Sequence, residues 1–316
     1  MADEIVREQR GHVLLLTINR PEARNAINRA TALALEAALD EAEANDEVWV
    51  IVLTGAGDKA FSAGMDLKAF AAGEVPFTDH GFAGIANRFL TKPIIAAANG
   101  AALAGGFEIM ISCDMVVAAD HAKFGIPEAS RGLIAGGGGL IRLAKRIPIT
   151  VAYEMALTAD PIDAQRAYEL GIVNRVVPGE ALLDTAIALA ERIAANAPLA
   201  VRTSKRVMHE ALELTEAEAW HVNNDAFGAI GASADALEGA VAFAEKRPPV
   251  WTGRYRCSRS SIRPSSPTRS RSPGSRCTCS PRPSGSAANW CSPASSARCA
   301  ASVPTRPSAW RPPSGA

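Results

Sequence analysis

The chain contains the apolar run Pro93-Ile-Ile-Ala-Ala-Ala98, which continues into Asn99-Gly-Ala-Ala-Leu-Ala-Gly-Gly-Phe-Glu108. An apolar run bounded by turn residues predicts a buried strand, and the glycines predict a turn into a helix from about Gly105. Working outward, similar strands are predicted over residues 48–53 and 115–119, and an amphipathic helix over residues 28–44. Buried strands that alternate with helices indicate an α/β core.

The later part of the body is predicted to be helical. Stripes of Ala, Leu, Ile and Val predict helices over residues 181–195, 199–213 and 216–243. We expect helices with this much apolar surface to pack on the core or on another subunit. The predicted organisation is therefore a core with the functional site over residues 1–195, a helical region over 196–254 and a separate segment over 255–316.

Charge divides the chain at about residue 255. Residues 1–254 hold 23 Lys and Arg against 33 Asp and Glu, whereas residues 255–316 hold 10 Arg, no Lys and no acidic residue. An acidic body argues against nucleic acid as its main ligand, because binding the phosphate backbone needs a basic face. The tail is rich in Ser, Pro and Arg without a hydrophobic period, which predicts disorder. Two alternatives stay open: a tail that contacts RNA or acidic surfaces, and a frame-shifted extension.

The body carries one cysteine, Cys113, which fits a reducing compartment and gives no disulfide framework. Its charged start lacks the apolar core of a signal peptide. The most apolar stretch, residues 94–111, is interrupted by glycines, Asn99 and Glu108, so we expect no membrane span. These features predict a cytoplasmic protein.

Glycine-rich turns follow several of the predicted strands, as in Ala63-Gly-Met-Asp-Leu67 and Gly105-Gly-Phe-Glu108. Such turns bring backbone N–H groups close to a ligand, and the N-terminus of a helix at Gly105 favours an anion. Glu108 lies one helical turn further on, and Glu128 follows Pro127. Two carboxyls beside an oxyanion-binding turn suit chemistry that needs a general base and a general acid. Spacing alone leaves open whether they meet.

The segments resemble the signature regions of the enoyl-CoA hydratase (crotonase) family. The resemblance covers residues 5–254 in the expected order and rests on Asn19-Arg-Pro21, Asn25-Ala-Ile27, Ala63-Gly-Met-Asp-Leu67, Gly105-Gly-Phe-Glu108, Gly125-Ile-Pro-Glu128, Gly136-Gly-Gly-Gly-Leu-Ile-Arg-Leu143 and Glu169-Leu-Gly-Ile-Val-Asn174. It implies a spiral of ββα units followed by a helical trimerisation region. It also implies an acyl-CoA substrate and a homo-oligomer, either a trimer or a dimer of trimers.

The same resemblance implies a set of site residues. The oxyanion hole falls on the backbone N–H groups of Met65 and Gly105, and the two hydratase glutamates fall on Glu108 and Glu128, with Glu108 mainly activating water. Glu22 stands where some members carry a basic residue, so Arg24 or Lys68 is expected at the CoA phosphates instead. The candidate contacts to CoA are Arg24, Ala26, Ala63, Asp66 and Lys68.

Several of these residues also have a purely structural interpretation. Taken alone, Glu108 is equally well interpreted as a structural acid paired with another group. Glu128 could be a solvated loop residue, and Gly136–Gly139 could form a tight turn. The five histidines lack metal-ligand spacing, so we expect no metal and no redox cofactor, with coenzyme A entering as part of the substrate. The preferred hypothesis is hydration of 2-trans-enoyl-CoA. The alternatives are isomerisation, thioester hydrolysis, or acyl-CoA binding without catalysis.

Overall fold

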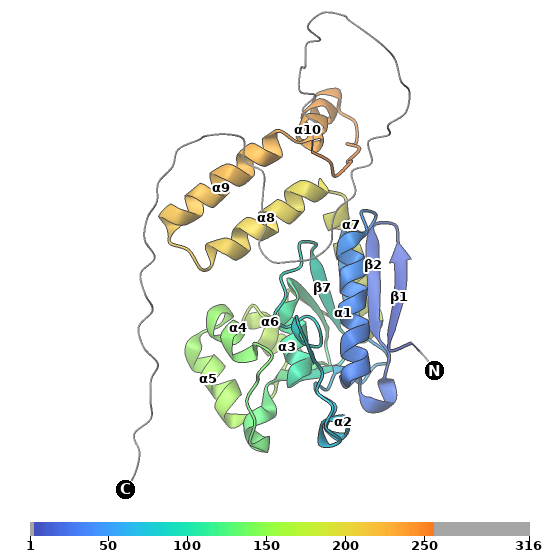
Figure 1. Ribbon diagram of the computed structural model, residues 1–316, viewed down its shortest axis with the longest axis vertical. Helices are drawn as coiled ribbons and strands as arrows, with labels where there is room; N and C mark the ends of the chain where they lie inside the picture. The colour runs from blue at the N-terminus through green and yellow to red at the C-terminus, as the bar shows by residue number, and fades with distance from the viewer. Residues whose placement is uncertain (1–2, 256–316) are drawn as a thin grey trace, which may run out of the picture. The chain divides into compact units, whose positions relative to one another are not determined.

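The computed structural model describes residues 3–255, and Figure 1 shows the order of their helices and strands. The tail predicted over residues 255–316 lies outside the described residues except for Tyr255. Among the described residues, no helix is both long enough and apolar enough to cross a membrane.

A six-stranded sheet forms the centre of the core. Its strand order is β1-β2-β3-β7-β9-β12, with β1 antiparallel to β2 and every other neighbouring pair parallel. The central parallel strands β3, β7 and β9 are almost continuous apolar runs because both faces of the sheet are covered there. The strands are β1 (Ile5–Arg10), β2 (Val13–Ile18), β3 (Val50–Gly55), β7 (Ile94–Ala98), β9 (Met115–Ala119) and β12 (Arg175–Val177).

A second sheet carries the turns that the sequence singles out. Its order is β11-β10-β8-β4, and β8 pairs in parallel with both β4 and β10. A separate two-stranded ribbon joins β5 to β6. These strands are β4 (Ala60–Ser62), β8 (Ala101–Leu103), β10 (Lys123–Gly125), β11 (Ile162–Asp163), β5 (Phe77–Thr78) and β6 (Gly81–Phe82).

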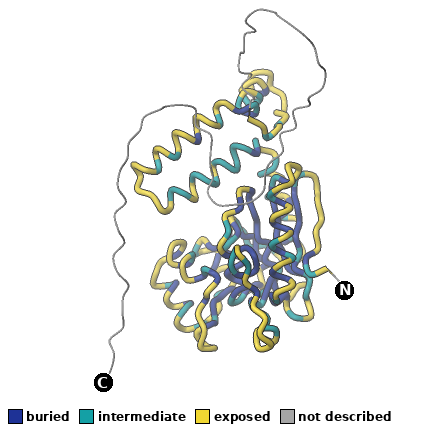
Figure 2. Tube along the Cα trace, in the orientation of Figure 1, coloured by how far each residue is buried: buried dark blue, intermediate teal, exposed yellow. Residues whose placement is uncertain are grey.

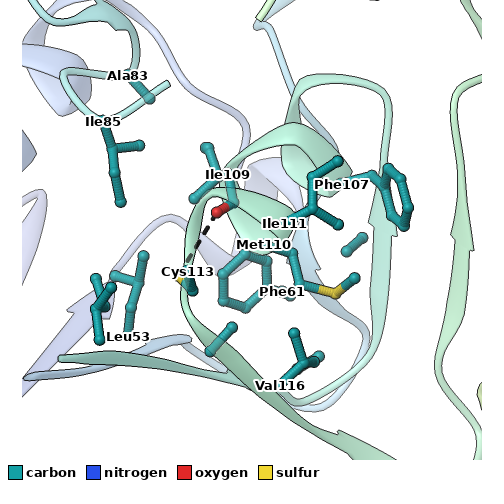
Figure 3. Packing of buried hydrophobic residues seen from close by; sticks show 14 of the residues in the cluster. Leu53, Phe61, Ala83, Ile85, Phe107, Ile109, Met110, Ile111, Cys113 and Val116 are labelled. Carbon is teal, nitrogen blue, oxygen red and sulfur yellow. Dashed lines mark hydrogen bonds between the residues drawn. The ribbon is translucent and has the colours of Figure 1, made fainter. Parts of the chain in front are cut away.

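Helices cover the two faces of the six-stranded sheet. Helix α7 (Leu182–Ala194) packs Leu182, Ala186 and Ala190 against side chains of β2, β3, β7 and β9. The opposite face contacts the larger core, to which α1 (Arg29–Ala44) and α3 (Gly105–Ser112) contribute. Figure 3 shows Phe107, Ile109 and Ile111 of α3 in this core. Apart from Glu108 and Ser112 the helix carries no polar side chain, as expected of a buried helix.

Short elements complete the core. They are the 3-10 helices η1 (Pro21–Ala23), η2 (Pro127–Arg131) and η3 (Gly179–Ala181), and the helices α2 (Leu67–Ala71), α4 (Gly139–Arg146), α5 (Ile149–Thr158) and α6 (Ala164–Glu169). The structure confirms the predicted α/β class. Cys113 is buried, and burial raises the pKa of its thiol.

Both ends of α1 are closed by side chains. Asn28 accepts a hydrogen bond from Thr31 N at 2.8 Å at the start of the helix. At the other end, the fully buried Lys92 donates to the backbone oxygens of Ala42 and Asn45. Burial lowers the pKa of Lys92 to about 8, and the favourable position of a cation at a helix C-terminus offsets part of this cost.

Three further helices follow α7, namely α8 (Pro198–Ala211), α9 (Glu216–Gly231) and α10 (Ala234–Glu245). The prediction of one helix over residues 216–243 is wrong, because the chain breaks between α9 and α10. Gly228 and Gly231 weaken the end of α9, and Ser233 starts α10 by accepting a hydrogen bond from Ala236 N at 3.0 Å. Figure 2 shows that α9 is mostly exposed, in contrast to the buried strands at the centre of the six-stranded sheet.

Candidate active site

Two backbone N–H groups near the junction of β4, β8 and α3, those of Met65 and Gly105, have no acceptor among the described residues. Ile27 and Met65 form a parallel bridge in which Gly64 O accepts from Ile27 N and Ile27 O accepts from Asp66 N. This pattern turns the N–H of Met65 away from Ile27. Gly105 is the first residue of α3, so its N–H has no acceptor within the helix. Neither N–H donates a hydrogen bond within residues 3–255.

Glycines allow these two N–H groups to lie close together. A methyl group built on Gly64 would lie 2.7 Å from Gly105 N, and Gly64 has a φ of +85°. One built on Gly106 would lie 1.9 Å from Ser62 O, so α3 packs directly on the backbone of β4. An unused donor at a helix N-terminus, with a second unused donor on the segment packed against it, can stabilise an oxygen that becomes negative.

Backbone strain is present next to the second donor. Ala104 has a φ of 51° and a ψ of −131°, a conformation that residues other than glycine rarely adopt. Two hydrogen bonds hold it, one from Ala104 N to Gly125 O at 2.9 Å and one from Glu108 N to Ala104 O at 3.1 Å. The surrounding structure therefore forces the direction of the Gly105 N–H.

Glu108 lies in the first turn of α3 and is 3% exposed. Its Oε1 accepts a hydrogen bond from Gly139 N at 2.9 Å. Burial raises the pKa of Glu108, while hydrogen bonding from the backbone of Gly139 and Gly137 and the charge of Arg142 act to lower it. The glycine run before α4 is thus a cradle for this carboxyl, a contact that the sequence analysis did not identify.

Glu128 lies in η2 and is 8% exposed. Its Oε2 is buried and has no hydrogen-bond partner among the described residues. Burial raises the pKa of Glu128 and the charge of Glu108 raises it further, while a hydrogen bond from its own backbone and the charge of Arg131 act to lower it. The two acids that lie 20 residues apart in the sequence are therefore both buried, and both have raised pKa values.

The candidate CoA-binding residues lie on two stretches of chain, residues 24–26 and 63–68, that are hydrogen-bonded to each other. Ala63 N donates to Arg24 O at 3.0 Å, which joins the turn after η1 to the end of β4. The side chains of Arg24 and Lys68 are exposed, whereas Ala26 is buried. Asp66 caps α2 through the N–H groups of Lys68 and Ala69, at 3.1 and 3.2 Å. The carboxylate of Asp66 is thus committed to local contacts.

Two residues that the sequence analysis did not assign fix this segment. Arg20 donates to Ala26 O at 2.6 Å and to Asp66 Oδ2 at 3.1 Å. Asn25 is fully buried, and its amide donates to Ala60 O at 2.7 Å. Their position in the quoted motifs Asn19-Arg-Pro21 and Asn25-Ala-Ile27 is the signal that points to them.

The aromatic ring of Phe82 lies beside the backbone of Gly105. A methyl group built on Gly105 would lie 2.5 Å from the ring of Phe82, so this ring packs on the Gly105 backbone. Phe82 also contacts Phe77 edge-on, with ring centroids 5.6 Å apart. No group of three or more His, Cys, Asp and Glu side chains arranged to hold a metal ion occurs in the part of the chain that the structure describes.

The sequence profile of the enoyl-CoA hydratase/isomerase family matches residues 8–254. The chain belongs to this family. A carnitinyl-CoA dehydratase from Citrobacter koseri is 41% identical over 262 residues, covering 80% of this chain and 100% of the relative. Solved structures agree with the fold. That of an enoyl-CoA hydratase from Mycobacterium tuberculosis H37Rv has a TM-score of 0.78 and 48% identity, covering 79% of this chain and 99% of that one.

A second solved structure carries another name within the family. The carnitinyl-CoA hydratase from Mycobacterium avium has a TM-score of 0.65 and 46% identity, covering 80% of this chain and 100% of that one. The family resemblance drawn from the motifs is confirmed, and so is the crotonase fold of the described body.

Proposed function

We propose that this family member is an enoyl-CoA hydratase, which adds water syn to 2-trans-enoyl-CoA and gives 3-hydroxyacyl-CoA in fatty-acid β-oxidation or related acyl-CoA catabolism. The observation that carries the proposal is the pair of buried carboxyls beside two unused backbone N–H groups. One carboxyl is held by N–H donors, and the other has an oxygen without a partner among the described residues.

Each residue has a defined role in the proposed reaction. The N–H groups of Met65 and Gly105 bind the thioester carbonyl oxygen and stabilise the charge that grows on it as the enolate forms. Glu108, ionised and held by Gly139, removes a proton from water while the oxygen attacks the β carbon. Glu128, in its neutral form, donates its proton to the α carbon. One water is consumed, and one proton passes from Glu108 to Glu128 before the next turnover.

Coenzyme A enters this scheme only as part of the substrate. Arg24 and Lys68 are exposed basic side chains close in sequence to Ala26 and Ala63, and they are proposed to contact the CoA phosphates, whereas Arg20 is held by Ala26 O and Asp66. Acid–base catalysis by two carboxyls and two N–H donors accounts for the reaction, so we propose no metal and no redox cofactor. The cytoplasm is the proposed compartment.

The test is the loss of enoyl-thioester absorbance with crotonyl-CoA and longer 2-enoyl-CoAs. Glu108→Gln and Glu128→Gln preserve the shape of the side chains, and each is expected to lower kcat by roughly 10²- to 10⁴-fold. Circular dichroism and thermal unfolding check that both variants fold. A wild type without turnover of any enoyl-CoA would overturn the proposal and direct attention to isomerisation, thioester hydrolysis or acyl-CoA binding without catalysis.

A second candidate substrate follows from the names of two relatives, a carnitinyl-CoA dehydratase and a carnitinyl-CoA hydratase. Carnitinyl-CoA is a 3-hydroxyacyl-CoA whose chain ends in a trimethylammonium group, so its dehydration is the reverse of the same chemistry. Comparing kcat/KM for carnitinyl-CoA with that for 3-hydroxybutyryl-CoA distinguishes the two. A preference of tenfold or more for carnitinyl-CoA, about 1.4 kcal/mol in transition-state binding, would move the assignment to the second candidate.

We also propose that the chain assembles as a trimer or a dimer of trimers. Large apolar side chains of α8–α10 stay exposed in the single chain, among them Met208, Phe227 and Phe243, with Phe227 80% and Phe243 88% exposed. Such side chains mark surfaces that a partner covers. Sedimentation at micromolar concentration is expected to show the trimer or hexamer mass, and a stable monomer would refute the assembly while leaving the catalytic proposal untouched.

A further inference from the structure

Arg142 reaches two backbone carbonyls from the middle of α4. Its guanidinium donates to Gly137 O at 3.2 Å and to Ala86 O. A methyl group built on Gly138 would lie 2.2 Å from Arg142 Nη1, so the guanidinium lies directly against the glycine run. The side chain thus joins two segments that lie about 50 residues apart in the sequence.

The first of these carbonyls belongs to the cradle of Glu108. Gly137 is followed by Gly138, with a φ of 94°, and by Gly139, whose N–H donates to Glu108 Oε1 at 2.9 Å. A glycine run has wide conformational freedom, so an external contact is needed to hold its N–H groups in one direction. The guanidinium of Arg142 supplies that contact by donating to Gly137 O. The backbone N–H of Arg142 also donates to Gly138 O at 3.0 Å, at the start of α4.

The second carbonyl belongs to the turn that carries Phe82, beside the oxyanion-binding N–H of Gly105. Phe82 O accepts hydrogen bonds from Ile85 N at 3.3 Å and from Ala86 N at 3.1 Å, which makes residues 82–86 a single turn. The ring of Phe82 packs on Gly105. Arg142 donates to the carbonyl at the end of this turn, and it thereby fixes the turn from which Phe82 projects.

We infer that Arg142 is a positioning residue that sets the glycine cradle of Glu108 and the Phe82 turn beside Gly105 in register with each other. This inference rests on the proposed hydration. It adds to that proposal the residue that aligns the base, Glu108, with the Phe82 turn beside Gly105. Arg142 touches neither substrate nor water in this role, and it acts through the backbone that it holds.

The charges around Glu108 agree with this geometry. Glu108 is faced by Glu128 from η2 and by Arg142 from α4, and Arg142 in turn is near Arg146 and Cys113. The raised pKa of the buried Cys113 keeps that thiol neutral. The charge of Arg142 lowers the pKa of Glu108 against the effect of burial. Removing the guanidinium therefore raises the pKa of Glu108 through lost charge and through loosened N–H donors.

The test compares Arg142→Gln, Arg142→Lys and a matched control, Arg146→Gln, which changes an arginine one turn further along α4. Arg146 makes no hydrogen bond with Gly137 or Ala86. Arg142→Gln is expected to lower kcat by about tenfold or more and to shift the acidic limb of the kcat/KM profile to higher pH. Arg142→Lys keeps the charge without the two-carbonyl fork, so it is expected to shift the acidic limb less than Arg142→Gln does while kcat still falls.

Crystal structures of the same three variants give a readout that needs no turnover. Loss of the Gly139–Glu108 hydrogen bond in Arg142→Gln, with the bond kept in Arg146→Gln, supports the inference. An unchanged cradle together with wild-type kcat and pH profile in Arg142→Gln would overturn it. If wild type lacks hydratase turnover, the proposed function fails, and the crystallographic comparison alone decides the role of Arg142.

Discussion

Gly139 N donates a hydrogen bond to Glu108 Oε1 at 2.9 Å. Glu128, the other buried carboxyl of the site, receives no such donor at Oε2 within the described residues. The surroundings of the two acids differ. Glu108 has the N–H donors of the glycine run and the charge of Arg142, whereas Glu128 has its own backbone N–H and the charge of Arg131, which act against the charge of Glu108. The N–H donors and the guanidinium favour an ionised Glu108 and so suit the proposed role of base, and an oxygen without a donor suits Glu128 to the proposed role of acid.

This asymmetry predicts a bell-shaped dependence of kcat/KM on pH. Activity rises as Glu108 loses its proton and falls as Glu128 loses its own. Burial raises both pKa values, so the rising limb is expected above the ordinary range of a glutamate. Because the two carboxyls interact, the midpoints of the two limbs give apparent pKa values of the pair and not of either residue alone. Initial rates from pH 4.5 to 10 test the prediction, and a constant kcat/KM across that range would contradict it.

Glu128→Gln is predicted to make the folded protein more stable at neutral pH while it removes activity. The pKa of Glu128 is raised in the folded state, so the stability that the protonated carboxyl contributes is complete below the unfolded-state pKa. It is lost as the pH rises through the folded-state pKa. An uncharged amide avoids this loss. Each unit of pKa shift corresponds to about 1.4 kcal/mol.

The measurement is the thermal midpoint of wild type and Glu128→Gln at pH 4 and pH 8. We expect the variant to melt higher at pH 8 and the difference to shrink at pH 4, where both side chains are neutral. Equal midpoints at pH 8 would show that burial of the ionised Glu128 carries no net cost.

Gly137→Ala is predicted to disturb the base without disturbing the fold. A methyl group at Gly137 would lie 2.7 Å from Glu108 Oε2, and the flexible carboxylate is the group that must move. Displacing a reacting group by a fraction of an ångström to 1 Å lowers kcat by roughly 10- to 100-fold. Gly136→Ala is the matched control, because its nearest neighbour, Ile134 O, is 4.0 Å away.

Turnover with crotonyl-CoA and the thermal midpoint are measured for both alanine variants. Gly136→Ala is expected to stay within about twofold of wild type. Equal activity losses in the two variants would mean that the glycine run matters for its backbone conformation and not for the space it leaves to Glu108.

The sequence predicts elements well where a local signal exists. The helix predicted over residues 28–44 is observed as Arg29–Ala44, because its apolar period and the Asn28 cap agree. Strand β1 (Ile5–Arg10) is not predicted, since only Ile5 of this edge strand is buried and the rest reads as a charged segment. Tertiary pairing with β2 makes it a strand.

The site divides in the same way. The motifs predict that Glu108 and Glu128 are functional, but nothing local shows that Gly139, 31 residues from Glu108, holds its carboxylate. The hydrogen bond from Arg142 to Ala86 O is equally unpredictable from the sequence, because it joins segments that only the fold brings together. Contacts of this kind depend on three-dimensional placement and leave no periodic or compositional trace in one sequence.

Ala104→Gly is predicted to stabilise the protein. Ala104 holds a φ of 51° and a ψ of −131°, and such strain costs of order 1–3 kcal/mol in a residue that carries a Cβ. Glycine removes that strain but costs about 0.5–1 kcal/mol through the greater freedom of the unfolded chain. The expected balance is a gain of about 1 kcal/mol in the free energy of unfolding.

Denaturant unfolding of Ala104→Gly and of Ala101→Gly measures this balance. Ala101 lies three residues earlier, in β8, and has no positive φ, so its change to glycine brings only the entropic cost and is expected to destabilise. Destabilisation of similar size in both variants would show that Ala104 is unstrained. A gain confined to Ala104→Gly would show that the fold spends stability to aim the N–H of Gly105 into the site.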